Sequence, residues 1–213
     1  MPPSLVWLSP TDPAFPLNFV RDLGDKTPKR IAAIRNLEIL KSQSVALLCS
    51  VKCPGSIILL TYDLAKGLRE AGVPVIGGFH SPMERECLRI LLRGEQPIVI
   101  CPARSLQGMR LPKEYNTPLD HNRLLLLSPF ADSQRRATVH TSLFRNQFVT
   151  ALADQVLVTY AAPSSKTFEL CRNIVSCGKP LLTLTNQANA HLVSLGARPL
   201  DVSSPVFSQL TST

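Results

Sequence analysis

Short, continuous apolar runs recur along the chain, and they constrain its fold more than any other feature. Each run has the length of a strand and is bounded by polar residues or turn-forming residues. A continuous apolar run of this length is typical of a strand that is buried on both faces, as in a parallel sheet. The clearest runs are Val45–Cys49, Pro97–Cys101, Leu124–Leu127, Gln155–Tyr160 and Pro180–Leu184.

Segments with apolar residues at helical spacing lie between these runs. In residues 56–71 the apolar positions include Ile57, Leu64 and Leu68, and Gly72 ends the pattern. We expect further helices in 83–92, 143–153, 167–176 and 188–195, and further short strands in 31–35 and 73–76. Strands that alternate with helices predict an α/β, Rossmann-like fold, with a mostly parallel sheet and helices on both of its faces.

The length of 213 residues fits a single domain. Residues 1–30 are rich in proline and show no period, so they predict an irregular N-terminal extension. Residues 31–202 contain all of the alternating pattern and form the predicted Rossmann-like domain. Residues 203–213 are expected to be a C-terminal tail.

The charge balance favours a polyanionic partner. Lysine and arginine number 23 against 15 aspartates and glutamates, which gives a net charge of +8. A basic surface attracts nucleic acid, nucleotide phosphates or acidic lipid. The longest apolar zone, 45–62, is interrupted by Lys52, Pro54 and Gly55, and this excludes a membrane span there. We expect a cytoplasmic protein that has no membrane partner.

The cysteines and histidines predict neither a metal site nor a disulfide framework. The six cysteines have no usual zinc-ligand spacing, and several lie inside apolar runs, where cysteine behaves as a small hydrophobic residue. No Ser/His/Asp order and no carboxylate pair indicates a catalytic centre. We expect no metal and no cofactor.

Ligands of such folds bind at the carboxyl ends of the strands, so the loops there carry the candidate site. The first loop, 49–56 (CSVKCPGS), runs from a strand into a helix. Gly55 lets a ligand approach the backbone closely, and the amides of the helix N-terminus attract phosphate. Ser50, Lys52 and Ser56 add hydroxyls and a charge. An ordinary strand-to-helix turn is the alternative interpretation.

The second loop, 77–84 (GGFHSPME), begins with two glycines. Gly77 and Gly78 again permit close approach to the backbone, and His80 is a candidate for a hydrogen bond to phosphate or base. Ser81 is a further candidate phosphate ligand. With Glu84 it also has the spacing of a helix capping box, and this purely structural role is the alternative.

The third loop, 161–169 (AAPSSKTFE), also opens a helix, and Ser164, Ser165, Lys166 and Thr167 are its candidate phosphate ligands. Serine capping alone is the alternative. A fourth feature is the polar pair Arg145 and Asn146 within an apolar helical stretch. An arginine that faces the same crevice would bind phosphate through two hydrogen bonds.

The order of these loops resembles the DNA-processing protein A family (DprA, also called Smf), which belongs with the LOG phosphoribohydrolases to one superfamily of Rossmann-like nucleotide binders. The resemblance spans about 12–202. It rests on segments similar to the family's successive motifs, namely NLEILKSQSVALLCSVK, LAKGLREAGVPVIGGFHSPMERECLRIL, PIVICPARSL, LFRNQFVTALADQVLVTYAA and GKPLLTLTNQANAHLVSLGARPL.

In the positions of the family's motifs, this chain keeps the loop serine as Ser50, a glycine as Gly78, and the Arg-Asn pair as Arg145 and Asn146. It also shows departures. The family has arginines where this chain has Val51, Ser81 and Gln147, a glycine at Pro82 and an aspartate at Glu84.

The resemblance implies a protein that binds single-stranded DNA in a basic pocket, helps to load a RecA-type recombinase and forms a homodimer. The alternative is a nucleotide-binding or LOG-like nucleotide-hydrolysing protein. LOG-type members have a Pro-Gly-Gly-x-Gly-Thr-x-x-Glu loop where this chain has 163–169. Pro163, Thr167 and Glu169 are kept and the three glycines are absent, so Glu169 is the candidate catalytic carboxylate of that alternative. The residues leave open whether the ligand is a polymer or a mononucleotide.

Overall fold

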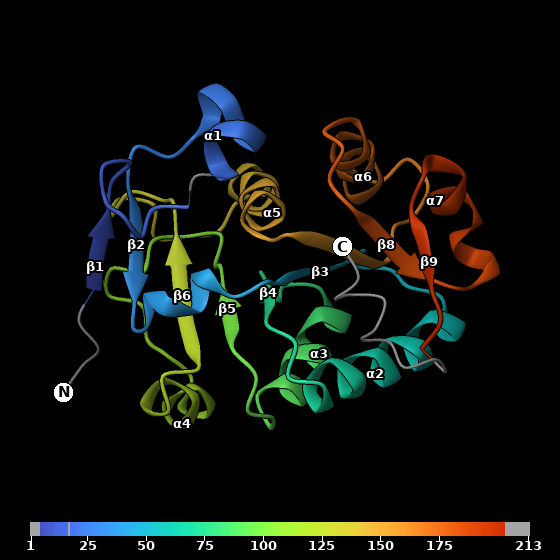
Figure 1. Ribbon diagram of the computed structural model, residues 1–213, viewed down its shortest axis with the longest axis horizontal. Helices are drawn as coiled ribbons and strands as arrows, with labels where there is room; N and C mark the ends of the chain where they lie inside the picture. The colour runs from blue at the N-terminus through green and yellow to red at the C-terminus, as the bar shows by residue number, and fades with distance from the viewer. Residues whose placement is uncertain (1–4, 17, 203–213) are drawn as a thin grey trace.

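A single sheet organises the computed structural model of the chain, which describes residues 5–16 and 18–202 (Figure 1). The strand order is β1-β2-β6-β5-β4-β3-β7-β8-β9. All neighbouring strands from β6 to β9 pair in parallel, while β2 pairs antiparallel with both β1 and β6. The strands are β1 (Leu5–Leu8), β2 (Ile31–Ile34), β3 (Val45–Cys49), β4 (Val75–Gly77), β5 (Ile98–Ile100), β6 (Leu124–Ser128), β7 (Gln155–Tyr160), β8 (Leu181–Leu184) and β9 (Arg198–Leu200).

Helices cover both faces of the sheet. In Figure 1, α1, α5 and α6 lie above the sheet, and α2, α3 and α4 lie below it. The α-helices are α1 (Asn18–Leu23), α2 (Gly55–Glu70), α3 (Pro82–Leu91), α4 (Asn116–Asp120), α5 (Val139–Leu152), α6 (Lys166–Ser176) and α7 (Ala190–Leu195). Short 3-10 segments are η1 (Gly24–Lys26), η2 (Leu37–Lys41), η3 (Lys113–Tyr115) and η4 (Gln187–Asn189).

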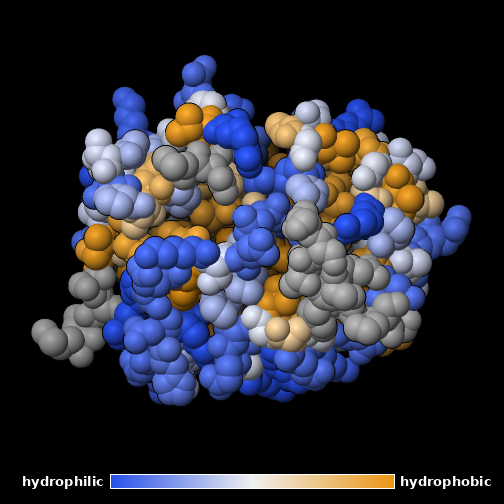
Figure 2. Space-filling model, in the orientation of Figure 1, coloured by the Kyte–Doolittle hydropathy of each residue, from blue (hydrophilic) through white to orange (hydrophobic). Residues whose placement is uncertain are grey.

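Two hydrophobic layers, one on each side of the sheet, form the core. Along β3, Val45 and Leu47 pack with α2 and α3, whereas Ala46 and Leu48 pack with α1 and α5. Successive side chains of a strand point to opposite faces, so a strand buried on both sides needs apolar residues at every position. The α/β, Rossmann-like prediction is confirmed. Figure 2 shows that hydrophilic side chains gather over the lower helices on the face in view.

The stretch 1–30 differs from the expected irregular extension. Leu5–Leu8 form β1, which pairs with β2 along its whole length, and Asn18–Leu23 form α1. Phe19 of α1 is fully buried, and its ring stacks on that of Phe148 in α5 with 4.6 Å between centroids. This segment therefore contributes an edge strand and a core helix to the same fold. The predicted tail, 203–213, lies outside the described residues.

The described residues contain no helix long and apolar enough to cross a membrane. They also contain no group of three or more histidine, cysteine or acidic side chains placed to hold a metal ion. All six cysteines are free thiols.

A substitution in α1 tests whether the N-terminal segment belongs to the core. Phe19→Ala removes a fully buried ring, so we expect it to lower the free energy of unfolding by about 3–5 kcal/mol. Val20→Ala is the matched control, because Val20 is the next residue of the same helix and is 59% exposed. Urea unfolding of the purified variants measures both values. Equal stability of Phe19→Ala and the wild type would show that α1 is a separable extension.

Candidate functional site

The strand order reverses between β3 and β7, and two of the predicted loops meet there. β3 pairs with β4 on one side and with β7 on the other. The backbone N–H of Ser50 donates to the carbonyl of Tyr160 at 2.9 Å, and the N–H of Ala162 donates to the Ser50 hydroxyl oxygen at 3.1 Å. The loops that follow β3 and β7 are thus joined at the place where open α/β sheets bind ligands.

A buried carboxylate ties the second loop to the first. The side chain of Glu84 is 5% exposed and accepts hydrogen bonds from the backbone N–H groups of Cys49, His80 and Ser81, at 2.9, 2.8 and 3.2 Å. Cys49 ends β3, and His80 and Ser81 follow β4. One side chain therefore fixes the loops after β3 and β4 relative to each other.

The N-terminus of α2 is the one of the three predicted helix starts that has no side-chain cap. Its N-cap is Pro54, which makes no side-chain hydrogen bond to the helix. Gly55 and Ser56 are exposed in its first turn, and neither N–H donates a hydrogen bond within the described residues, whereas the N–H of Ile57 donates to the carbonyl of Pro54 at 3.0 Å. Uncapped N–H groups and the positive end of the helix dipole attract anions. Lys52 is exposed beside them and forms no ion pair within 5–16 and 18–202.

At each of the other two helix starts, a serine side chain caps the N–H of the third helical residue. Ser81 and Glu84 form a capping box at α3, as the sequence pattern predicts, and Ser81 is buried. At α6 the Ser165 hydroxyl oxygen accepts from the N–H of Phe168 at 3.1 Å. Two of the predicted phosphate ligands thus serve as helix caps.

The remaining polar groups of the third loop are spread around the start of α6. Lys166 forms an ion pair with Glu169 at 3.0 Å, and both side chains are exposed. Ser164 is exposed and has a positive φ of 59°, and Thr167 is half-buried. Glu169 is therefore a first-turn partner of a lysine at a helix N-terminus, where the dipole favours an acidic residue.

Packing explains both glycines of the second loop. A Cβ on Gly77 would lie 2.8 Å from the ring of Phe79, and a Cβ on Gly78 would overlap the guanidinium of Arg145. The glycines make room for neighbouring side chains of the protein itself. Phe79 is buried under its own loop with 6% exposure, so its ring is not open to a base.

Arg145 lies inside the protein and does not project into a crevice. It is 4% exposed, its Nη1 donates to the carbonyl of Cys101 at 3.3 Å, and its Nε donates to Asn146 Oδ1 at 2.8 Å. Burial lowers the pKa of Arg145, and the nearby Glu84 carboxylate opposes that shift. A guanidinium remains protonated in proteins, so Arg145 contributes a buried positive charge beneath the loop after β4.

The sequence did not predict that His191 holds the third loop in place. The Nε2 atom of His191, in α7, lies 2.7 Å from the carbonyl oxygen of Ala161, and its ring packs against Phe168. A lone histidine about 30 residues downstream carries no local signal for this contact. It helps to fix the loop after β7 beside Ser50.

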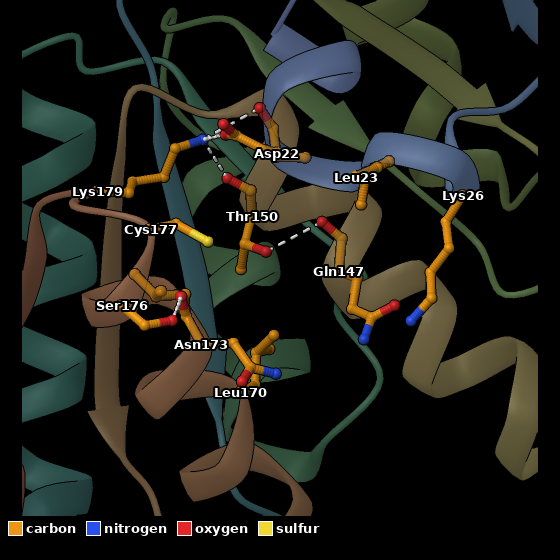
Figure 3. A pocket seen from close by; sticks show the side chains of 12 residues that line it. Asp22, Leu23, Lys26, Gln147, Thr150, Leu170, Asn173, Ser176, Cys177 and Lys179 are labelled. Atoms are coloured by element: carbon orange, nitrogen blue, oxygen red, sulfur yellow. Dashed lines mark hydrogen bonds and ion pairs between the residues drawn. The ribbon is translucent and has the colours of Figure 1, made fainter.

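A separate cavity of about 270 Å³ lies between α1, α5 and α6 (Figure 3). It is bordered by Lys179, whose ammonium is buried. This group donates to the carbonyls of Thr150, Ala151 and Ala153 at the end of α5 and pairs with Asp22 at 2.6 Å. Lys179 precedes β8, so the cavity opens near the amino ends of the strands and is not part of the candidate site.

Comparison with known proteins gives one family. The family model described as DNA recombination-mediator protein A matches residues 7–209. No curated protein sequence matches the chain.

Solved structures show the same fold at low sequence identity. DNA processing protein A from Streptococcus pneumoniae is 17% identical, with a TM-score of 0.80 over 99% of this chain and 76% of that one. DNA processing protein A from Helicobacter pylori, whose structure concerns its mode of binding single-stranded DNA, is 19% identical, with a TM-score of 0.75 over 97% and 96%. The molybdenum cofactor carrier protein of Chlamydomonas reinhardtii is 11% identical, with a TM-score of 0.55 over 81% and 100%.

The close approach of Gly78 to Arg145 gives a testable prediction. Gly78→Ala forces the buried guanidinium out of its place, and we expect a loss of about 1–3 kcal/mol in the free energy of unfolding. Gly55→Ala is the control, because a Cβ there meets nothing within 4 Å, and its stability should be unchanged or slightly higher. Thermal and urea unfolding measure both. If Gly78→Ala were as stable as the wild type, the packing account of this loop would fail.

Proposed function

The chain belongs to the DNA recombination-mediator protein A family, and from that premise we propose that it binds single-stranded DNA at the carboxyl edge of β3, β4 and β7. The strand's phosphates contact the uncapped start of α2 and the side chain of Lys52. Binding serves DNA recombination, and it leaves the DNA chemically unchanged.

One observation carries this proposal: the first turn of α2 offers free N–H groups to solvent beside an unpaired lysine. Gly55 and Ser56 supply the N–H groups, and Pro54 leaves them without a side-chain cap. α3 and α6 begin at the same edge but are capped. The free N–H groups of α2 lie beside the unpaired Lys52, whereas Lys166 at α6 is paired with Glu169, so an anion at this edge gains most at α2.

The family and the charge favour a polymer over a mononucleotide. A net charge of +8 supports binding in which many phosphates release counterions, and such binding weakens steeply with salt. The structural relative from Helicobacter pylori binds single-stranded DNA, and its fold covers nearly the whole of this chain. We extend that ligand to this protein. A RecA-type recombinase and a second copy of the chain are the proposed protein partners.

Two lysines on either side of β3 give a matched test. Lys52 follows the strand at the proposed site, and Lys41 precedes it at the opposite edge. Both are exposed, and Lys41 is paired with Glu38 at 2.7 Å. We expect Lys52→Ala to weaken binding of an oligothymidylate by up to about fivefold, the worth of one exposed ionic contact. The slope of log K against log salt should become shallower by about 0.7, the value for one phosphate on a single strand.

Fluorescence anisotropy at several salt concentrations measures both quantities. Lys41→Ala should bind as the wild type does, and thymidine monophosphate should not compete at concentrations near the oligonucleotide's dissociation constant. Wild-type protein that binds no oligonucleotide at low salt would contradict the proposal. So would equal losses in Lys41→Ala and Lys52→Ala, because they would indicate a diffuse charge effect.

A further inference from the structure

A groove of about 350 Å³ lies between the N-terminal half of α2 and α3, beside the loop after β3. Its walls come from three elements. Val51 and Cys53 belong to the loop, Ile58 and Tyr62 to α2, and Met83 to α3. Val51 and Cys53 flank Lys52 in sequence, so the groove begins where the proposed phosphate site ends.

Apolar side chains and the ring of Tyr62 line one part of the groove, and Arg85, Glu86 and Arg89 of α3 line the rest. Tyr62 is half-buried, so part of its ring remains open to the groove. Val51 is 69% exposed, so its apolar side chain is open to solvent at the rim of the groove. Burial raises the pKa of the Cys53 thiol, which keeps this group neutral at pH 7. A flat, uncharged ring such as a nucleobase fits these walls.

Arg85 provides a free positive charge at the rim of the groove. It is exposed, and it has no ion pair within the part of the chain that the structure describes. The one carboxylate of the groove, on Glu86, is paired with Arg89. The acidic side chain is therefore neutralised. The groove keeps the positive charge of Arg85, and Lys52 lies between the lining residues Val51 and Cys53 in the sequence.

We propose that this groove is a nucleobase subsite of the bound single strand. Tyr62 stacks on one base, and Arg85 contacts the phosphate next to it. The inference rests on the proposed function and adds the path of the strand, from the start of α2 across to α3. An apolar peptide would also fit the walls, but the two unpaired cations favour a polyanion that carries flat rings.

Tyr62 is tested with a pair of variants and an abasic oligonucleotide. Base stacking on an aromatic side chain is worth a factor of about 5 to 150 in affinity, so Tyr62→Ala should weaken oligothymidylate binding within that range. Tyr62→Phe keeps the ring and should bind as the wild type does. Scanning one abasic position along the oligonucleotide should find a position that weakens wild-type binding and leaves Tyr62→Ala binding unchanged.

Arg85 is tested against an arginine beyond the other end of the same helix. Arg85→Ala should make the salt slope shallower by about 0.7, as expected for one lost phosphate contact. Arg93→Ala removes the same charge from an exposed position after α3 and should leave affinity and slope unchanged. Because Arg85 is exposed, this comparison remains decisive even where Tyr62→Ala disturbs folding, which circular dichroism reports.

DNA binding by the protein and base binding in the groove are tested by different outcomes. If wild-type protein binds no oligonucleotide, the proposed function is wrong. If it binds, but Tyr62→Ala and Arg85→Ala bind as tightly and with the same salt slope, the groove inference is overturned and the site at α2 stands. Strong binding of an apolar peptide in the groove, with DNA binding unaffected by Tyr62→Ala, would likewise overturn it.

Discussion

The buried carboxylate of Glu84 is the interaction on which the geometry of the strand ends depends. It accepts three backbone N–H groups, one from the end of β3 and two from the loop after β4. Hydrogen bonds to a charged group contribute about 1.5–3 kcal/mol each, and a buried carboxylate without partners would be strongly unfavourable. The buried guanidinium of Arg145 adds a favourable charge nearby. With these two loops fixed, the uncapped start of α2 faces solvent beside the loop after β7.

Free charge beside free donors separates three loops that look alike in sequence. Each follows a strand, contains serine or glycine and opens a helix. Ser81 and Ser165 accept the N–H of the third helical residue, and at α2 the corresponding N–H, of Ile57, bonds to the carbonyl of Pro54. α3 begins with Pro82, which has no N–H, and Lys166 at α6 is paired with Glu169. Lys52 at α2 is unpaired within the described residues, and residue composition alone does not reveal this difference.

The continuous apolar runs made the core sheet predictable, because a strand buried on both faces needs apolar residues at every position. β1 was missed because Leu5–Leu8 is a short edge strand among prolines. β9 was missed because its exposed Arg198 and Pro199 lack the apolar pattern of a buried strand.

In the site, the spacing of Ser81 and Glu84 predicted their role as a helix cap. A polar residue in an apolar helix either faces a ligand site or is buried against the protein's own loops. Arg145 was interpreted as a ligand, and only its packing against Gly78 shows that it is buried.

The claim that an anionic strand binds the free donors of α2 can be observed directly at two backbone amides. An NMR titration of isotopically labelled protein with oligothymidylate follows the N–H signals of Gly55 and Ser56. The account predicts large shifts of both signals and slower hydrogen exchange at both, with the N–H of Phe168, already bonded to Ser165, less affected. Saturable binding that leaves the Gly55 and Ser56 signals in place would contradict it.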